Sequence, residues 1–88
     1  MRYAGGMVTL QVYIAEDCWS CQETRRIVAD MQHQFPEVVF ELCDTTHTPL
    51  PELVFATPTY VLNGRIVALG NPTRDLLRQK LMDAHEGQ

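Results

Sequence analysis

Two cysteines, Cys18 and Cys21, are separated by two residues in the stretch "DCWSC". A pair with this spacing can form a structural disulfide, supply two metal ligands, or act as a dithiol that is reversibly oxidised. At the start of a helix both side chains lie on one side, and the unpaired N–H groups there favour the reactive thiolate. Cys18 can then attack a disulfide of a partner, and Cys21 can displace that partner. The flanking segments decide among these three chemistries.

Composition restricts the class of protein. The chain has 88 residues, of which 45% are hydrophobic and 20% charged, so we expect one globular domain over 1–88, with flexible ends at 1–7 and 86–88. The formal net charge of −4 weighs against a nucleic-acid or membrane-surface partner, which would select a basic face. No apolar run approaches the roughly 20 residues of a membrane helix.

The cysteine count and the first residues bear on the compartment. The start of the chain, "MRYAGGM", is not followed by the apolar segment of a secretion signal. Three cysteines are an odd number, which is a poor disulfide framework. We therefore expect a cytoplasmic protein, in which a Cys-x-x-Cys pair is catalytic or metal-binding.

The hydrophobic pattern predicts a βαβ unit around the cysteine pair. Residues 8–15 (VTLQVYIA) are rich in β-branched and aromatic side chains and indicate a strand. Apolar residues within 21–35 recur at three- and four-residue spacing, which is typical of a helical face. Residues 38–43 (VVFELC) indicate a second strand, parallel to the first because a helix connects them. We expect Cys18 at the junction of strand and helix, and Cys21 one turn further along.

The second half of the chain predicts a hairpin followed by a helix. Residues 57–70 contain two apolar runs joined by Asn63–Gly64, which is the strongest short signal for a hairpin. Residues 71–84 show a helical pattern. The element order is strand, helix, strand, strand, strand, helix. It predicts an α/β fold with a four-stranded mixed sheet flanked by helices.

The last helix has its own predicted details. Asn71 is expected to cap it, and Pro72 to take the first helical position. The residues expected on one side of this helix are Leu76, Leu77, Lys80, Leu81 and Ala84. Met82 is a further candidate for the core.

Three motifs, in this order, resemble the thioredoxin–glutaredoxin superfamily: "VYIAEDCWSCQETRRIV", "TPTYVLNG" and "GNPTRDLL". The resemblance extends over 8–85 and implies a thioredoxin-like fold of glutaredoxin size. It implies a thiol–disulfide oxidoreductase acting on protein partners, with Cys18 as nucleophile and Cys21 as resolving thiol, no cofactor, and an upstream reductant. It also implies that the Thr57–Pro58 bond is cis and that this pair receives an extended substrate beside the cysteines.

The residues between the cysteines, Trp19 and Ser20, differ from the Gly-Pro of thioredoxins and the Pro-Tyr of glutaredoxins. Trp19 is either an apolar contact for protein partners or packs on its own loop. We take both residues as candidate substrate-binding residues, together with Thr57 and Pro58.

Several positions depart from the pattern of the superfamily. Val12 stands six residues before the first cysteine, where thioredoxins usually have a buried acid. Glu16 and Asp17 precede the motif, where glutaredoxins often have a lysine, and these acids oppose a lowering of the pKa of the first cysteine. Pro72 and Thr73 occupy the place of the Cys-Asp pair through which glutaredoxins bind glutathione. These departures weigh against glutathione as a partner.

The alternative function is a non-catalytic binding module of the same fold. A Cys₃His zinc site would use these four residues: Cys18, Cys21, Cys43 and His47. Against zinc, the cysteine pair begins an amphipathic helix, and the chain has enough apolar residues to fold without a metal. Cys43 ends the second strand, so we expect it at the same end of the sheet as the motif, as a structural cysteine or as a third redox thiol.

Overall fold

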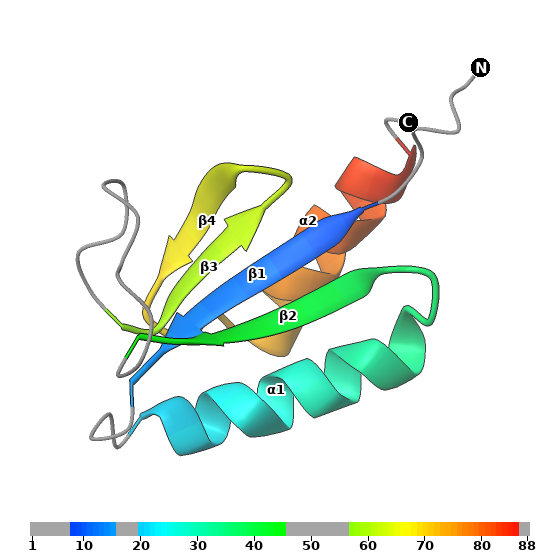
Figure 1. Ribbon diagram of the computed structural model, residues 1–88. Helices are drawn as coiled ribbons and strands as arrows, with labels where there is room; N and C mark the ends of the chain where they lie inside the picture. The colour runs from blue at the N-terminus through cyan, green and yellow to red at the C-terminus, as the bar shows by residue number, and fades with distance from the viewer. Residues whose placement is uncertain (1–7, 16–19, 46–56, 87–88) are drawn as a thin grey trace.

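The computed structural model describes residues 8–15, 20–45 and 57–86. Its elements are listed in chain order: β1 (Thr9–Ile14), α1 (Cys21–Gln34), β2 (Val39–Asp44), β3 (Thr59–Leu62), β4 (Arg65–Leu69) and α2 (Arg74–Glu86) (Figure 1). This is the predicted order of strands and helices. The predicted flexible ends lie outside the described residues, except Glu86, which ends α2.

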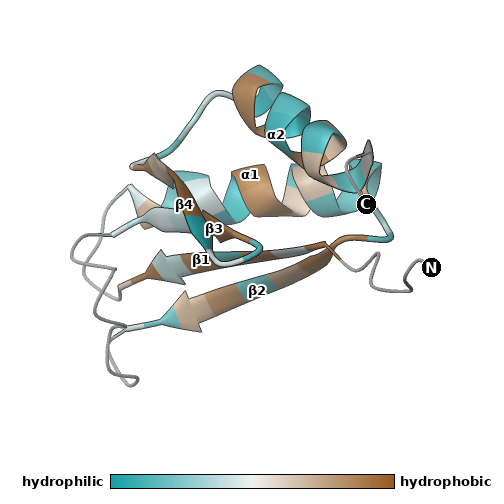
Figure 2. Ribbon diagram, turned by 90° about the horizontal axis from the view of Figure 1, so that it is seen from above, coloured by the Kyte–Doolittle hydropathy of each residue, from teal (hydrophilic) through white to brown (hydrophobic). Residues whose placement is uncertain are grey.

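The four strands form one mixed sheet in the order β2-β1-β3-β4. β1 is parallel to β2, and β3 is antiparallel to both β1 and β4. Both helices lie on the same side of the sheet (Figure 2). The predicted βαβ unit is therefore present, with α1 as its crossover.

The core lies between the sheet and the two helices. Alternate residues of β1 point towards the helices, so Leu10, Val12 and Ile14 are buried while the residues between them are half-buried. They form one cluster with apolar residues of both helices: Ile27, Val28 and Met31 of α1, and Leu77 and Leu81 of α2. This packing fixes α1 against β1, the strand that leads into the cysteine motif.

The predicted hairpin between β3 and β4 is confirmed. Asn63 and Gly64 have φ values of 50° and 86°, the positive values that a tight two-residue hairpin turn requires. Asn63 also ties the turn to the start of β1, because its side-chain Oδ1 accepts a hydrogen bond of 2.9 Å from the N–H of Thr9, and its own N–H donates to the Thr9 carbonyl, also at 2.9 Å. Val67 is an extra residue in β4, since Tyr60 pairs with Ala68 and Val61 with Ile66.

The start of α2 differs from the prediction. The helix begins at Arg74, and the hydroxyl oxygen of Thr73 accepts a 3.1 Å hydrogen bond from the N–H of Leu76. Thr73 is therefore the cap, and the prediction that Asn71 caps the helix with Pro72 in its first position is wrong. Met82, a candidate for the core, is exposed instead, and so is Leu76, which was expected on the same side as Leu77 and Leu81. The buried side of α2 contains Leu77 and Leu81, which are four residues apart. The residues next to them in the sequence therefore face outward.

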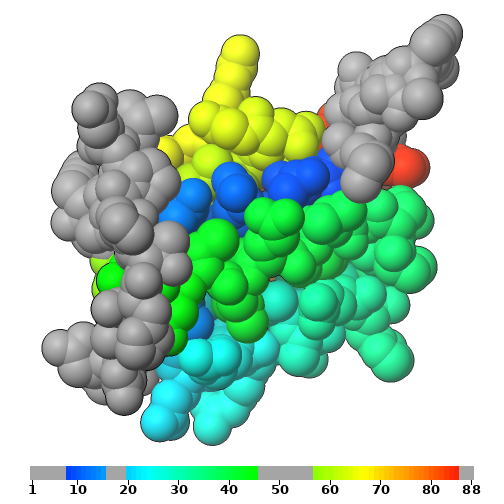
Figure 3. Space-filling model, viewed as in Figure 1, coloured from blue at the N-terminus to red at the C-terminus, as the bar shows by residue number. Residues whose placement is uncertain are grey.

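The face of the sheet away from the helices contains the other set of β1 side chains (Figure 3). On this face Gln11 donates a hydrogen bond of 3.1 Å to the carboxylate of Glu41 on β2. No described helix is both long and apolar enough to cross a membrane.

Candidate functional site

Of the cysteine motif, the structure describes Ser20 and Cys21. Cys18 and Trp19 lie outside the described residues, as do Glu16 and Asp17. Ser20 is the N-cap of α1 and has helical dihedral angles, φ −75° and ψ −12°. Its carbonyl accepts the N–H of Thr24 at 3.2 Å, which is the first hydrogen bond of the helix. Cys21 is therefore the first residue of α1, and its predicted position one turn inside the helix is wrong.

Cys21 is inaccessible and oxidised. Its side chain is 3% exposed and belongs to the core cluster. Its sulfur is in a disulfide, whereas Cys43 is a free cysteine. A buried thiol at the first position of a helix can take part in exchange only with a sulfur that is brought to it.

The second predicted motif leads into β3. The Thr57–Pro58 peptide bond is cis, which is the isomer that the resemblance implies. Pro58 is buried and Thr57 is half-buried. The next residue, Thr59, pairs with Tyr13 near the carboxyl end of β1. The Pro58 segment therefore enters the sheet beside the strand end that leads into the cysteine motif.

Two residues of the segment between β4 and α2, Gly70 and Asn71, join these two motifs. The N–H of Gly70 donates a hydrogen bond of 2.8 Å to the carbonyl of Pro58. The side-chain Nδ2 of Asn71 donates one of 2.9 Å to the carbonyl of Ser20. Gly70 has a φ of 85°, in the left-handed region that favours glycine. The backbone of Gly70 and the side chain of Asn71 thus connect the Pro58 segment to Ser20, the residue that precedes Cys21.

The side-chain oxygen of Asn71 is hydrogen-bonded to two buried hydroxyls. Its Oδ1 accepts hydrogen bonds of 2.6 Å from Thr24 and 2.8 Å from Tyr60. Both of these residues are 0% exposed. Burial is the main reason that the pKa of Tyr60 is raised to about 12. Among the described residues, every buried side-chain nitrogen or oxygen has a hydrogen-bond partner.

Sequence reasoning missed this polar cluster of Thr24, Tyr60 and Asn71. One signal was present, because Thr24 shares the helical face of Ile27, Val28 and Met31 and so places a hydroxyl in the core. A buried hydroxyl requires a partner. The partner itself could not be found from spacing, since Asn71 lies 47 residues away along the chain.

Cys43 lies on β2 opposite Tyr13, near the carboxyl ends of both parallel strands. This confirms its predicted place in the sheet. Its side chain is half-buried, and burial, followed by the nearby Glu41, raises its pKa. The described residues contain no group of three or more His, Cys, Asp or Glu that could hold a metal. Two members of the predicted zinc set, Cys18 and His47, lie outside those residues.

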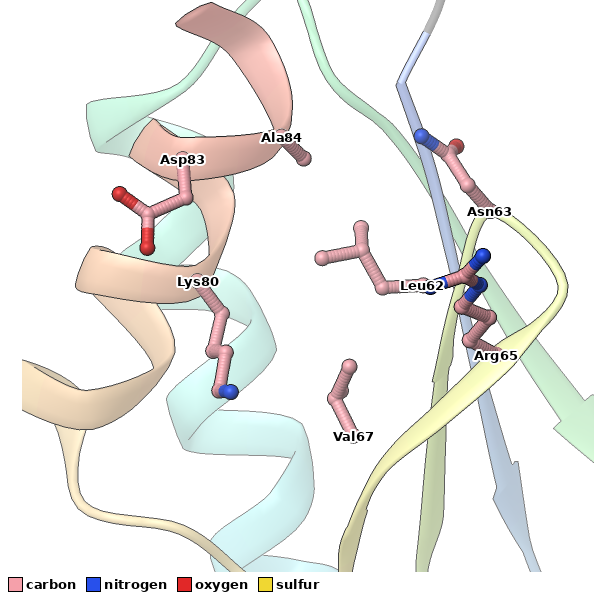
Figure 4. Close-up of a pocket in the computed structure, with 7 residues that line it drawn as sticks. All are labelled: Leu62, Asn63, Arg65, Val67, Lys80, Asp83 and Ala84. Carbon is pink, nitrogen blue, oxygen red and sulfur yellow. The ribbon is translucent and has the colours of Figure 1, made fainter. Parts of the chain in front are cut away.

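A hollow of about 590 Å³ lies away from the cysteine motif, between the β3–β4 hairpin and α2 (Figure 4). It is lined by Leu62, Asn63, Arg65, Val67, Lys80, Asp83 and Ala84. Because Asn63 is bonded to Thr9 at the start of β1, this hollow lies at the opposite end of the sheet from the carboxyl end of β1. It is separate from the candidate site.

Comparison with known proteins agrees with this architecture. No family model matches the chain. A thioredoxin of Methanocaldococcus jannaschii is 26% identical over 74 residues, which cover 80% of this chain and 87% of the relative. The crystal structure of thioredoxin from Trypanosoma brucei brucei has a TM-score of 0.73 and 24% identity, covering 92% of this chain and 77% of that chain. The chain has a thioredoxin-like fold.

A further neighbour has a TM-score of 0.70 and 20% identity, covering 88% of this chain and 78% of that chain. It comes from a study of the thiol resolving mechanism in yeast mitochondrial 1-Cys peroxiredoxin via glutathione/thioredoxin systems. The relative, together with the fold shared with the neighbours, supports a thioredoxin-like superfamily, which the three motifs also indicate. They support a redox function of the thioredoxin type.

The structure shows the surroundings of two residues that depart from the superfamily pattern, Val12 and Thr73. Val12 is 0% exposed, and it pairs with Leu42 and Tyr60 in the sheet. The position of the usual acid is thus part of the apolar core. Thr73 uses its hydroxyl to cap α2.

Electrostatic contacts link the two helices near the site. Arg74 at the start of α2 donates from Nε to Asp30 at 2.6 Å and from a terminal nitrogen to Glu23 at 3.2 Å. Glu23 lies in the first turn of α1, and hydrogen bonds from Arg26 and Arg74 lower its pKa. These bonds join the start of α2 to the first turn and to the second half of α1.

Proposed function

We propose that this protein is a thiol–disulfide oxidoreductase that exchanges disulfides with protein partners through Cys18 and Cys21. The observation that carries the proposal is Cys21, which is buried and oxidised at the first position of α1 within a thioredoxin-like fold. A thiol placed there benefits from the unpaired N–H groups of the helix start when it becomes a thiolate.

The reaction would proceed in two exchanges. The Cys18 thiolate attacks one sulfur of a partner disulfide, so a mixed disulfide forms while the partner's other sulfur leaves as a thiolate and takes a proton. The Cys21 thiolate then attacks the Cys18 sulfur and releases the partner's second thiol. Two electrons have moved to the partner, and the protein holds a Cys18–Cys21 disulfide. An external dithiol reductant restores the pair by the reverse exchanges, so no cofactor is needed.

Protein substrates would bind across the two motifs. Trp19 and Ser20 would contact the partner beside the cysteines, while Thr57 and Pro58 would receive its extended backbone. Half-exposed Thr57 at the entry to β3 supports this role. One structural neighbour comes from work on how a thiol of yeast mitochondrial 1-Cys peroxiredoxin is resolved via glutathione/thioredoxin systems. This supports proteins as the partners. We propose the cytoplasm as the compartment, because reducing conditions there return the pair to the dithiol.

The test is reduction of insulin by dithiothreitol, followed by the turbidity of the released chain. We expect the wild type to shorten the lag and the Cys18→Ser/Cys21→Ser variant to behave like dithiothreitol alone. A wild type no faster than this variant would refute the proposal. Zinc is measured in the same preparations, because zinc bound at one equivalent and lost in the double variant would favour the binding-module alternative.

A further inference from the structure

We propose that Asn71 is a positioning residue that stabilises the disulfide form of the Cys18–Cys21 pair by holding the backbone carbonyl of Ser20. This inference rests on the proposed function, since it concerns the same cysteines. It assigns a role to a residue that lies 50 positions from Cys21 in the sequence, in the motif "GNPTRDLL" and not in the motifs that contain the cysteines and Pro58.

The first step is the place of Ser20, which lies between the two cysteines. Its carbonyl accepts a bond from within α1, from the N–H of Thr24 at 3.2 Å. The 2.9 Å bond from Asn71 is shorter and comes from a different part of the fold. The Asn71 bond therefore ties Ser20, the residue before Cys21, to the segment that precedes α2.

The second step is the orientation of the Asn71 amide. Thr24 and Tyr60 hydroxyls each carry one hydrogen, and each is within 2.8 Å of Asn71 Oδ1. The Ser20 carbonyl can only accept, so it faces the N–H₂ group of the amide, and Oδ1 faces the two hydroxyls, which can donate to it. Because Thr24 and Tyr60 are fully buried, water does not compete at that end, and the donor towards Ser20 is held in place.

The third step is the effect on the cysteines. Closing a disulfide across the motif removes backbone freedom from the residues between the two sulfurs, and that loss costs free energy. If Ser20 is already held in the conformation seen here, with Cys21 oxidised, less freedom remains to be lost. The Asn71 donor should therefore favour the disulfide over the dithiol.

The experiment uses Asn71→Asp, which keeps an oxygen for Thr24 and Tyr60 but replaces the donor that faces Ser20 with a second oxygen. Each protein is equilibrated with graded dithiothreitol buffers, quenched and alkylated. By mass, the dithiol form gains three alkyl groups and the disulfide form gains one, since Cys43 is free in both. We expect the equilibrium constant for disulfide formation to fall about tenfold, a rise in potential of about 30 mV for a two-electron couple.

Two control variants separate positioning from general loosening. Tyr60→Phe removes one donor to Oδ1 but leaves the bond to Ser20, and Thr24→Ser retains the hydroxyl. We expect Thr24→Ser to stay within about twofold of the wild-type constant. Tyr60→Phe, which keeps the Thr24 bond to Oδ1 and the bond to Ser20, should shift it far less than Asn71→Asp, for which a tenfold change needs about 1.4 kcal/mol. The urea midpoint of every variant is measured in both redox forms, and Asn71→Ala replaces Asn71→Asp if the latter does not fold.

The outcomes distinguish this inference from the proposed function. The inference about Asn71 is overturned if the equilibrium constant for disulfide formation in Asn71→Asp stays within twofold of wild type. It is also overturned if Tyr60→Phe shifts that constant equally. A wild type that forms no disulfide between Cys18 and Cys21 also overturns it. A wild type that is inactive on insulin, with the shift present in Asn71→Asp, refutes the proposed function and supports the positioning role.

Discussion

The hydroxyl of Tyr60 donates a 2.8 Å hydrogen bond to the side-chain oxygen of Asn71, and through that amide it is connected to the turn that precedes Cys21. Tyr60 belongs to β3 and is fully buried. The same bond therefore serves two purposes. It satisfies a hydroxyl in the core, and it orients an amide at the candidate site.

Removal of this hydroxyl should cost a modest amount of stability. In Tyr60→Phe the oxygen of Asn71 keeps its bond from Thr24, so no buried group is left without a partner, and we expect a loss of about 1 kcal/mol. Urea denaturation of the oxidised protein measures it. The matched control is Tyr13→Phe on the open face of the sheet, which should cost less than about 0.5 kcal/mol. Equal losses in the two variants would contradict the role given to the Tyr60 bond.

The same tyrosine makes stability depend on alkaline pH. Its pKa is raised from 10.0 to about 12 by burial in the folded protein, so the folded state keeps a proton that the unfolded state loses. Its contribution is complete below pH 10 and is lost as the pH rises towards 12, with a slope of about 1.4 kcal/mol per pH unit. The difference between wild type and Tyr60→Phe, measured by urea denaturation from pH 9 to 11.5, should show this slope. A difference that does not change with pH would contradict it.

The sequence predicted the framework of the site because local patterns determine that framework. Alternation in β1, helical spacing in α1 and the Asn63–Gly64 turn each depend on neighbours within a few residues. The parallel pairing of β1 and β2 then follows from the helix between them. These features bring the start of α1 and the Pro58 segment to the same end of the sheet.

The role of Asn71 could not be predicted correctly, because it does not depend on residues nearby in the sequence. Asparagine before a helical pattern usually acts as a cap, and in this chain Thr73 takes that role two residues later. This leaves the Asn71 amide for tertiary contacts with Ser20, Thr24 and Tyr60. Nothing in the spacing of the sequence encodes those contacts, which depend on how α1, β3 and α2 pack. The extra residue Val67 in β4 was missed likewise, since its register depends on pairing with β3.

Glutathione should be a poor substrate. Pro72 and Thr73 stand where the resemblance implies a Cys-Asp pair, and the Thr73 hydroxyl already accepts the N–H of Leu76. We expect turnover in a glutathione-coupled hydroxyethyl disulfide assay to be far below that of a dithiol glutaredoxin measured in parallel. Insulin reduction on the same preparation is the control for an active protein. Rates comparable with the glutaredoxin would show that the glutathione prediction is wrong.

Cys43 should react slowly and should not be needed for exchange. It is half-buried, and burial together with Glu41 raises its pKa, so little thiolate is present at neutral pH. In the oxidised protein, iodoacetamide at pH 8 should modify Cys43 more slowly than it modifies free glutathione, and unfolding in urea should remove the difference. Mass spectrometry follows both rates. Modification at the glutathione rate in the folded protein would instead favour a third redox thiol.

The two motif cysteines should have different roles in capturing a partner. Cys21 is 3% exposed at the first position of α1, so a bulky partner disulfide cannot reach its sulfur directly. Cys18 precedes it in the motif and must make the first attack, after which Cys21 resolves the mixed disulfide. The Cys21→Ser variant should therefore accumulate mixed disulfides with protein partners through Cys18, whereas Cys18→Ser should capture none.

Each variant is expressed, quenched with acid and examined on non-reducing gels for high-mass adducts that disappear with dithiothreitol. Cys43→Ser is the matched control, and we expect it to capture and release partners as the wild type does, because Cys43 is half-buried on β2. Combining Cys43→Ser with Cys21→Ser shows whether the trapped adducts depend on Cys18 alone. Adducts that form equally well in Cys18→Ser would reverse the assignment, since the buried position of Cys21 would then not limit its access to a partner.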